Sequence, residues 1–212
     1  MPILLEHWKF QTTSTGETQV LPDGCRDLII KHGAGDAPVW FITDMAKTSE
    51  TVSSHRGDHY NGFRLRLGVR IDQAGLMASL REGLSDTDIM ERLHSYVREG
   101  PAVSEALARL ADGRLSVAKA AADLGVQTRS LQRLLKRSTG QTPAFWMRLA
   151  RVRRAAHAML KAGSLAELAY DMGYADQAHM TREMRHWLGV TPRQIKRDAG
   201  WHQQHLGLGY GA

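Results

Sequence analysis

Cysteine is almost absent from this chain of 212 residues, in which Cys25 is the only one. A lone cysteine excludes an internal disulfide framework and a multi-cysteine zinc site. We expect it to be a small buried residue, with a redox-sensing thiol beside Arg26 as the alternative. Long apolar runs are also missing, because no stretch approaches the roughly 20 residues needed to span a bilayer. The first seven residues lack the basic segment that begins a signal peptide. We therefore expect a cytoplasmic protein with no membrane partner.

Catalytic motifs are absent as well. The sequence has no Gly-x-Ser-x-Gly, no P-loop, no Gly-x-Gly-x-x-Gly that opens a helix and no His-Glu-x-x-His. We therefore expect no enzymatic activity and no cofactor. His55 and His59, with Asp58, have a spacing that could hold a metal ion on a helix, but Arg56-Gly57-Asp58 is typical of a turn. A small metal-binding enzyme is kept as an alternative for the N-terminal part.

Charge is present but unevenly distributed. The chain holds 28 Lys and Arg against 22 Asp and Glu, a formal net charge of +6. Residues 1–110 carry a net charge of −3 and residues 111–212 a net charge of +9. Such an asymmetry predicts a module that binds a polyanion, joined to a part with a different task.

The N-terminal part has the pattern of short strands. Leu21-Pro22-Asp23-Gly24 is a turn sequence. Strands are predicted from Asp27, at 39–42 and over 63–67, where apolar and charged residues alternate. Helical spacing follows over 86–98 and 102–111. We predict an α+β fold with a small β-rich domain and trailing helices over 1–112, followed by an all-α domain over 113–200 and a flexible tail over 201–212.

The C-terminal part contains an internal repeat with a shift of 48 to 49 residues. Each copy begins with a serine N-cap, Ser116 or Ser164, and a short amphipathic helix that ends at Gly125 or Gly173. A second helix follows, over 128–137 or 176–185. Both copies close with Gly-x-Thr-Pro, in which threonine is placed as N-cap and proline as first helical residue of another helix. Two matched copies of helix, glycine turn and helix indicate two helix-turn-helix units rather than ordinary helical hairpins.

The second helix of each unit has an exposed face suited to DNA. In the first unit Leu131, Leu134 and Leu135 form the expected buried stripe, and the opposite face carries Arg129, Gln132, Arg133 and Lys136. In the second unit Met180, Met184 and Leu188 are expected inside, with Ala178, Thr181, Arg182 and Arg185 outside and Gln177 at the start. Arginine can bind guanine bidentately and glutamine can bind adenine, so both faces predict base reading in the major groove.

A linker helix is predicted over 143–162, with an apolar stripe of Phe145, Leu149, Val152, Ala156 and Met159. Its length of roughly 27–30 Å approaches one turn of B-DNA, so it could place the two recognition helices in successive major grooves. Arg148, Arg151, Arg153 and Arg154 lie off the stripe. We predict phosphate contacts from Lys136, Arg148, Arg151 and Arg185.

Residues 114–197 resemble the DNA-binding domain of the AraC/XylS family of bacterial transcription regulators. The resemblance is carried by residues 121–126, 131–136, 140–143, 155–156, 168–174, 180–184 and 189–192. It implies seven helices, one of which joins the two units, and sequence-specific regulation at promoters. The family's base-reading positions fall on Arg129, Gln132, Arg133, Gln177, Thr181 and Arg182. Leu or Met at 131, 135, 180 and 184 replaces the phenylalanine often found there, with similar volume.

Residues 21–29 are similar to a segment of short sensor domains, often half of a cupin-like barrel, that are joined to such DNA-binding domains. The resemblance implies a double-stranded DNA partner, with RNA polymerase and a small-molecule effector as further candidate partners. Two alternatives stay open for the N-terminal part: a constitutive regulator in which it only dimerises or contacts polymerase, and a cupin-like metal-binding enzyme. Both a monomer and a homodimer are compatible with the sequence.

Overall fold

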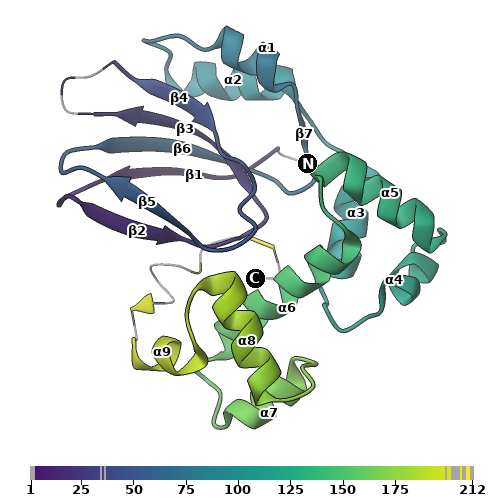
Figure 1. Ribbon diagram of the computed structural model, residues 1–212. Helices are drawn as coiled ribbons and strands as arrows, with labels where there is room; N and C mark the ends of the chain where they lie inside the picture. Colours follow the sequence, from purple (N-terminus) through teal and green to yellow (C-terminus); the bar gives the residue numbers. More distant parts are fainter. Residues whose placement is uncertain are drawn as a thin grey trace. The chain divides into compact units, whose positions relative to one another are not determined.

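The computed structural model describes residues 3–33, 35, 37–198, 200–201, 206 and 209–210. Its strands are β1 (Leu4–Gln11), β2 (Gly16–Val20), β3 (Arg26–His32), β4 (Val39–Ile42), β5 (Glu50–Ser54), β6 (His59–Leu65), β7 (Arg70–Ile71) and β8 (Val97–Arg98). Its helices are α1 (Gln73–Ser79), α2 (Asp86–Tyr96), α3 (Pro101–Leu110), α4 (Val117–Asp123), α5 (Thr128–Thr139), α6 (Pro143–Ala158), α7 (Leu165–Asp171), α8 (Gln177–Leu188) and α9 (Pro192–Arg197). Figure 1 shows these elements along the chain. The predicted α+β class, strands first and helices after, is confirmed.

The chain forms two compact units. Unit 1 comprises Met1–Thr18, Cys25–Met45 and Thr51–Ser104, and unit 2 comprises Gln19–Gly24, Ala46–Glu50 and Glu105–Ala212. Two short segments of the N-terminal half therefore belong to the helical unit, an arrangement that a single boundary near residue 112 does not describe.

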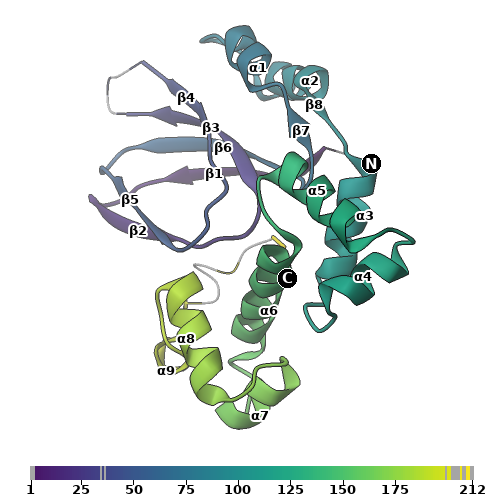
Figure 2. The ribbon, with the colours of Figure 1, turned by 45° about the vertical axis from the view of Figure 1, so that its right-hand side comes forward.

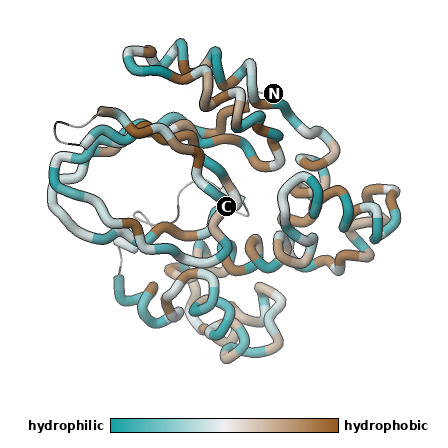
Figure 3. Tube along the Cα trace, turned by 45° about the horizontal axis from the view of Figure 1, so that its top comes forward, coloured by the Kyte–Doolittle hydropathy of each residue, from teal (hydrophilic) through white to brown (hydrophobic). Residues whose placement is uncertain are grey.

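The centre of unit 1 is an antiparallel sheet with the strand order β1-β6-β3-β4. Side chains alternate between its two faces, and Leu28, Ile30 and Phe63 point to the same face. There they pack with Leu76 of α1 and Ile89 of α2 in one buried core. Figure 3 shows the mixed hydrophobic and hydrophilic colouring of these two helices, as expected for helices that bury one side. Cys25 is buried, as predicted.

Two sequence predictions in unit 1 differ from the structure, and one helix is not indicated by the sequence. The strand predicted at 63–67 is β6, which begins four residues earlier and ends at Leu65. The helix predicted over 86–98 ends at Tyr96, because Val97 adopts an extended conformation and pairs with Ile71 of β7. Helix α1 was not predicted, since its seven residues are too few to show a helical period.

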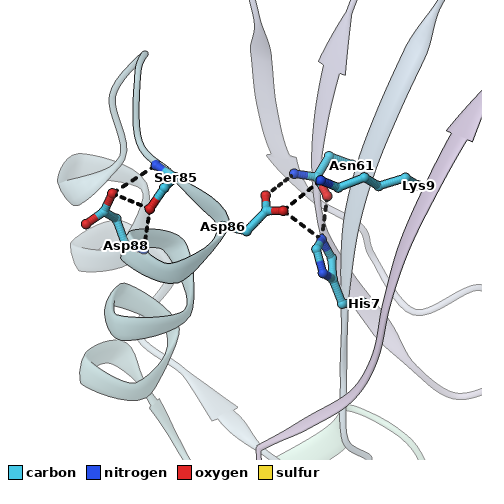
Figure 4. A network of polar contacts seen from close by, with 6 residues as sticks. All are labelled: His7, Lys9, Asn61, Ser85, Asp86 and Asp88. Atoms are coloured by element: carbon cyan, nitrogen blue, oxygen red, sulfur yellow. Dashed lines mark hydrogen bonds and ion pairs between the residues drawn. The ribbon is translucent and has the colours of Figure 1, made fainter.

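A polar network ties α2 to the sheet (Figure 4). The carboxylate of Asp86, in the first turn of α2, accepts hydrogen bonds from Lys9 Nζ at 2.7 Å and from Asn61 Nδ2 at 2.8 Å. The ring of His7 lies beside the same carboxylate, with 3.8 Å between Nε2 and Oδ2, and stacks on Phe63. Hydrogen bonds from Lys9, which outweigh the opposing effect of burial, lower the pKa of Asp86. The network fixes the N-terminal end of α2 against β1 and β6.

Gly62 makes room for an aromatic side chain on the other face of the sheet. Trp8 lies directly over Gly62, and its indole N–H donates to Asp27 Oδ1 at 2.9 Å. A Cβ atom at position 62 would overlap the Trp8 ring. We expect Gly62→Ala to displace Trp8 and to lower the free energy of unfolding by about 1–3 kcal/mol, measured by denaturant titration. Gly16→Ala is the matched control, because nothing lies within 4 Å of a Cβ there; equal effects of the two substitutions would contradict the account.

Unit 2 contains the predicted repeat. Ser116 and Ser164 cap α4 and α7 by accepting hydrogen bonds from the backbone N–H of Lys119 and Glu167. Thr142 and Thr191 cap α6 and α9 in the same manner, each followed by proline at the first helical position. These predictions are confirmed. Figure 2 shows α4 with α5 and α7 with α8 as two helix pairs, joined by α6.

The linker helix is shorter than predicted. It spans Pro143–Ala158 instead of 143–162, and hydrogen bonds between residues three apart continue the chain as turns, for example from Lys161 N to Ala158 O. Its sixteen residues give a length of about 24 Å. A second correction concerns Arg153, which we expected among the arginines off the apolar stripe. It is 1% exposed, and its Nη1 donates to the carbonyl of Pro22 at 3.4 Å.

Hydrogen bonds join the segments 19–24 and 46–50 to the helices of unit 2. The backbone N–H of Ser49 donates to Trp187 O at 3.0 Å, next to the C-terminal end of α8. The N–H of Tyr210 donates to Asp23 O at 2.8 Å, and its hydroxyl donates to Leu107 O at 2.9 Å. In the region predicted as a flexible tail, Trp201 and Tyr210 are buried. Residues 202–205, 207–208 and 211–212 of that region lie outside the described residues.

Candidate nucleic-acid interface

Each helix pair of unit 2 closes through a glycine with a positive φ angle. Gly125, between α4 and α5, has a φ of 66°, and Gly173, between α7 and α8, has a φ of 75°. Glycine adopts this left-handed conformation without a steric penalty, which permits the tight turn of a helix-turn-helix unit. The second helices, α5 and α8, both end at a left-handed glycine, Gly140 or Gly189. The two helix-turn-helix units of unit 2 therefore have the same local construction.

The buried side of each second helix agrees with the sequence pattern. Leu131 and Leu135 of α5 are at most 1% exposed, while Leu134 is partly buried. Met180 and Met184 of α8 are fully buried. Apolar packing thus sets which face of each helix turns outward.

The predicted base-reading side chains are on the outward faces. Five of them are exposed: Arg129, Gln132, Arg133, Gln177 and Arg182. In the part of the chain that the structure describes, none of these five forms a side-chain hydrogen bond or an ion pair. Thr181 is partly buried, and its hydroxyl donates to the Gln177 carbonyl at 2.9 Å. Long polar side chains with unused donors are available to a partner molecule.

The side chains predicted to contact phosphate fall into two groups. Lys136 and Arg185 are exposed near the C-terminal ends of α5 and α8, and Lys136 Nζ donates to Gly140 O at 2.8 Å. Arg148 and Arg151, on α6, instead bind Glu183 of α8. The guanidinium of Arg148 holds both carboxylate oxygens, at 2.6 Å and 3.1 Å, and its side chain is 47% exposed. Arg151 lies 3.7 Å from the carboxylate, and its side chain is only 18% exposed.

Glu183 was not singled out in the sequence. Burial of Glu183 favours its neutral form, but hydrogen bonds from Arg148 and the charge of Arg151 prevail, so that its pKa lies below the usual range. The same hydrogen bond raises the pKa of Arg148. A signal was present, because Glu183 occupies a position of the buried stripe where the first unit has Leu134. A carboxylate at such a position needs a cationic partner.

A shallow groove of about 480 Å³ lies over α6 within unit 2, between the start of the first helix-turn-helix unit and the turn of the second. It is lined by residues of three segments: Gly113, Arg114, Leu115, Met147, Arg151, Tyr170, Asp171 and Gly173. Tyr170 is 83% exposed and Arg114 is also exposed. The lining is of mixed charge.

The histidine pair considered for metal binding lies at a turn. The carboxylate of Asp58 accepts hydrogen bonds from the backbone N–H of His55 at 2.9 Å and from the Tyr60 hydroxyl at 3.2 Å, and it pairs with Lys31 at 2.8 Å. The His55 N–H and Lys31 lower the pKa of Asp58 to about 2. Asp58 thus closes the turn between β5 and β6, and among the described residues no group of three His, Cys, Asp or Glu side chains is placed to hold a metal ion.

No helix in the described part of the chain combines the length and the apolar character needed to cross a membrane.

Comparison with known proteins concerns mainly the helical unit. A family model described as a helix-turn-helix domain matches residues 120–198. The regulatory protein Ada of Salmonella typhimurium is 34% identical over 67 residues, which are 32% of this chain and 19% of that protein. The chain therefore spans about a fifth of that relative.

One solved structure extends the comparison of folds to most of the chain. The structure of ToxT from Vibrio cholerae has a TM-score of 0.50 and 9% sequence identity, over 91% of this chain and 96% of that chain. This likeness concerns the fold alone. A transcriptional regulator with an AraC-type DNA-binding domain, from Chromobacterium violaceum, is 25% identical over 46% of this chain and 90% of that chain, with a TM-score of 0.42. Residues 120–198 of the chain therefore match a helix-turn-helix domain model of the AraC type.

Proposed function

We propose that this protein is a sequence-specific DNA-binding transcription regulator whose α5 and α8 read two successive major grooves. The observation that carries the proposal is the pair of matched outward faces, with Arg129, Gln132 and Arg133 on one helix and Gln177, Thr181 and Arg182 on the other. Their donors and acceptors suit base edges in the major groove, where an α-helix fits. The net charge of +9 on residues 111–212 favours a polyanionic partner.

The linker helix supports the proposal that both helix-turn-helix units of one chain read DNA. Helix α6 is about 24 Å long, and the flanking residues 140–142 and 159–164 add to the separation of the two units. Successive major grooves on one side of B-DNA are about 34 Å apart. One chain can therefore cover two half-sites without a second copy, although a homodimer is compatible with the same interface.

We assign the phosphate contacts chiefly to Lys136 and Arg185. Both are exposed on the helices that carry the base-reading residues. Arg148 shares its half-exposed guanidinium with Glu183, so it supplies at most a weaker contact. The Arg151 side chain is mostly buried against Glu183, and we assign it a role inside the domain.

We further propose that unit 1 modulates the activity by receiving a small-molecule effector or by contacting RNA polymerase. The support is the sheet face opposite the core, where Trp8, Phe10, Tyr60 and Phe41 share one side according to the strand register. Phe10 is 54% exposed and Phe41 is 37% exposed. An exposed aromatic surface is typical of a site for a ligand or a partner protein.

Selection from a pool of random 30-base-pair duplexes tests the DNA-binding proposal. The purified full-length protein is expected to enrich a common sequence over successive rounds, with affinity well above that for the starting pool. Failure to enrich any sequence, with the protein shown to be folded, would contradict sequence-specific recognition.

Lys136→Ala is expected to weaken binding on all sequences alike, because a phosphate contact carries no sequence information. The slope of log K against log salt concentration should become shallower by about one unit, since one fewer counterion is released. Fluorescence anisotropy at several salt concentrations measures both effects. Arg81→Ala, which removes an exposed charge between α1 and α2, is the control and should leave the slope unchanged. An unchanged slope for Lys136→Ala would exclude Lys136 as a phosphate contact.

A further inference from the structure

A buried carboxylate in the middle of α8 joins this helix to the linker helix. Glu183 is 8% exposed, although it lies on the helix whose outward face carries the candidate base-reading residues. Arg148 of α6 binds it bidentately, and Arg151, one turn further along α6, approaches it to 3.7 Å. Two cations from one helix therefore hold one anion of the other.

Arg151 extends the same cluster to the turn that precedes α8. Its guanidinium carbon lies 4.6 Å from the centre of the Tyr174 ring, and its Nη1 donates to the carbonyl of Gly173 at 3.3 Å. Tyr174 is itself 5% exposed. The cluster of Arg148, Arg151, Glu183 and Tyr174, which we call the clamp, thus grips α8 at its middle and at the turn before its first residue.

Among the described residues, the first helix-turn-helix unit has no cluster equivalent to the clamp. Through the repeat, Glu183 corresponds to Leu134 and Tyr174 corresponds to Val126, which is 43% exposed. Helix α5 is held on α6 by apolar packing and one neutral hydrogen bond, from the Trp146 indole to Thr139. Helix α8 is held in addition by charge-assisted hydrogen bonds. A bidentate arginine–carboxylate pair fixes relative orientation more narrowly than apolar contacts do.

We propose that Glu183 is a positioning residue that, through the clamp, sets the orientation of α8 on α6 and hence the spacing of half-sites that the protein accepts. The inference rests on the proposed function, because spacing has meaning only if both helices read DNA. An ion pair that buries a carboxylate contributes little net stability compared with apolar packing, because the carboxylate must lose its hydration. The clamp therefore restricts geometry more than it stabilises the fold.

The test uses the duplex enriched by the wild-type protein and two derivatives with one or two base pairs inserted between its half-sites. Each inserted base pair turns one half-site by about 34–36° relative to the other. We expect the wild type to lose about 10-fold in affinity or more per insertion, comparable to the loss of a base contact. Glu183→Gln, which keeps the shape but removes the charge, is expected to bind the original duplex more weakly and to lose less than about 3-fold per insertion, because an unclamped α8 can adapt.

Glu167→Gln is the matched control, since it makes the same chemical change at an exposed position of α7. Glu167→Gln is expected to lose as much affinity per inserted base pair as the wild type does. If Glu183→Gln also loses as much affinity per inserted base pair as the wild type, the inference is overturned. If Glu183→Gln does not fold, Arg148→Lys, which retains the charge but loses the bidentate geometry, decides by the same comparison. A wild type that enriches no sequence, or enriches a single half-site, would instead refute the proposed function before any variant is compared.

Discussion

Arg133→Ala is expected to lower affinity for the selected duplex by about 1–3 kcal/mol, which is roughly 5- to 150-fold, and to relax sequence preference at one base pair. Arg133 is exposed on α5 and, within the described structure, has no intramolecular partner that would have to be broken on binding. Its guanidinium can therefore donate two parallel hydrogen bonds to a guanine. Anisotropy titrations against the selected duplex and its three variants at the base pair concerned measure both effects.

Arg133→Lys is the matched variant for this prediction. It keeps the positive charge, so binding to random duplexes should stay close to that of the wild type. Its single ammonium group lacks the fork geometry, so discrimination in favour of guanine should fall. Equal weakening of Arg133→Ala on selected and random duplexes would show that Arg133 binds phosphate and does not read a base.

Trp146→Ala is expected to have the largest effect on stability, about 3–5 kcal/mol in the free energy of unfolding. Trp146 lies on α6 and is 1% exposed, with its ring edge-on to Phe145 at 5.6 Å and to Tyr210 at 5.0 Å between ring centres. The substitution removes this packing and leaves a cavity at the junction of α5 and α6. Urea denaturation followed by circular dichroism measures the loss.

Thr139→Val separates packing from hydrogen bonding at the same place. The hydroxyl of Thr139, in the last turn of α5, accepts the Trp146 indole N–H at 3.1 Å and donates to Leu135 O. Valine keeps the shape and removes the acceptor, so the expected cost is only about 1–2 kcal/mol. A Trp146→Ala protein no less stable than Thr139→Val would contradict the assignment of Trp146 to the core of unit 2.

The repeat in the C-terminal part was predictable because its signals are local. Serine and threonine caps, glycines at left-handed positions and prolines at first helical positions each depend on a few neighbouring residues. The outward positions of Arg133 and Arg182 follow from the helical period once Leu131 and Met180 are assigned to the core.

The roles of the linker arginines were not predictable in the same way. Helix α6 is covered around most of its circumference, so Arg153 is buried although it lies off the expected apolar stripe. The partner of Arg148 and Arg151 is Glu183, more than thirty residues away. The helical period places Glu183 on the buried stripe of α8 but does not identify its partners. Likewise, the inclusion of segments 19–24 and 46–50 in unit 2 depends on single backbone contacts such as Ser49 to Trp187, which have no sequence signature.

Methylation interference on the selected duplex tests the central claim most directly. Methylation of guanine N7 blocks a contact in the major groove without changing the sequence. We predict two clusters of interfering guanines on one side of the duplex, about 10–10.5 base pairs apart, one for α5 and one for α8. Arg133→Ala should remove interference in one cluster and Arg182→Ala in the other. A single cluster, or two clusters that respond to the same substitution, would contradict reading by both helices.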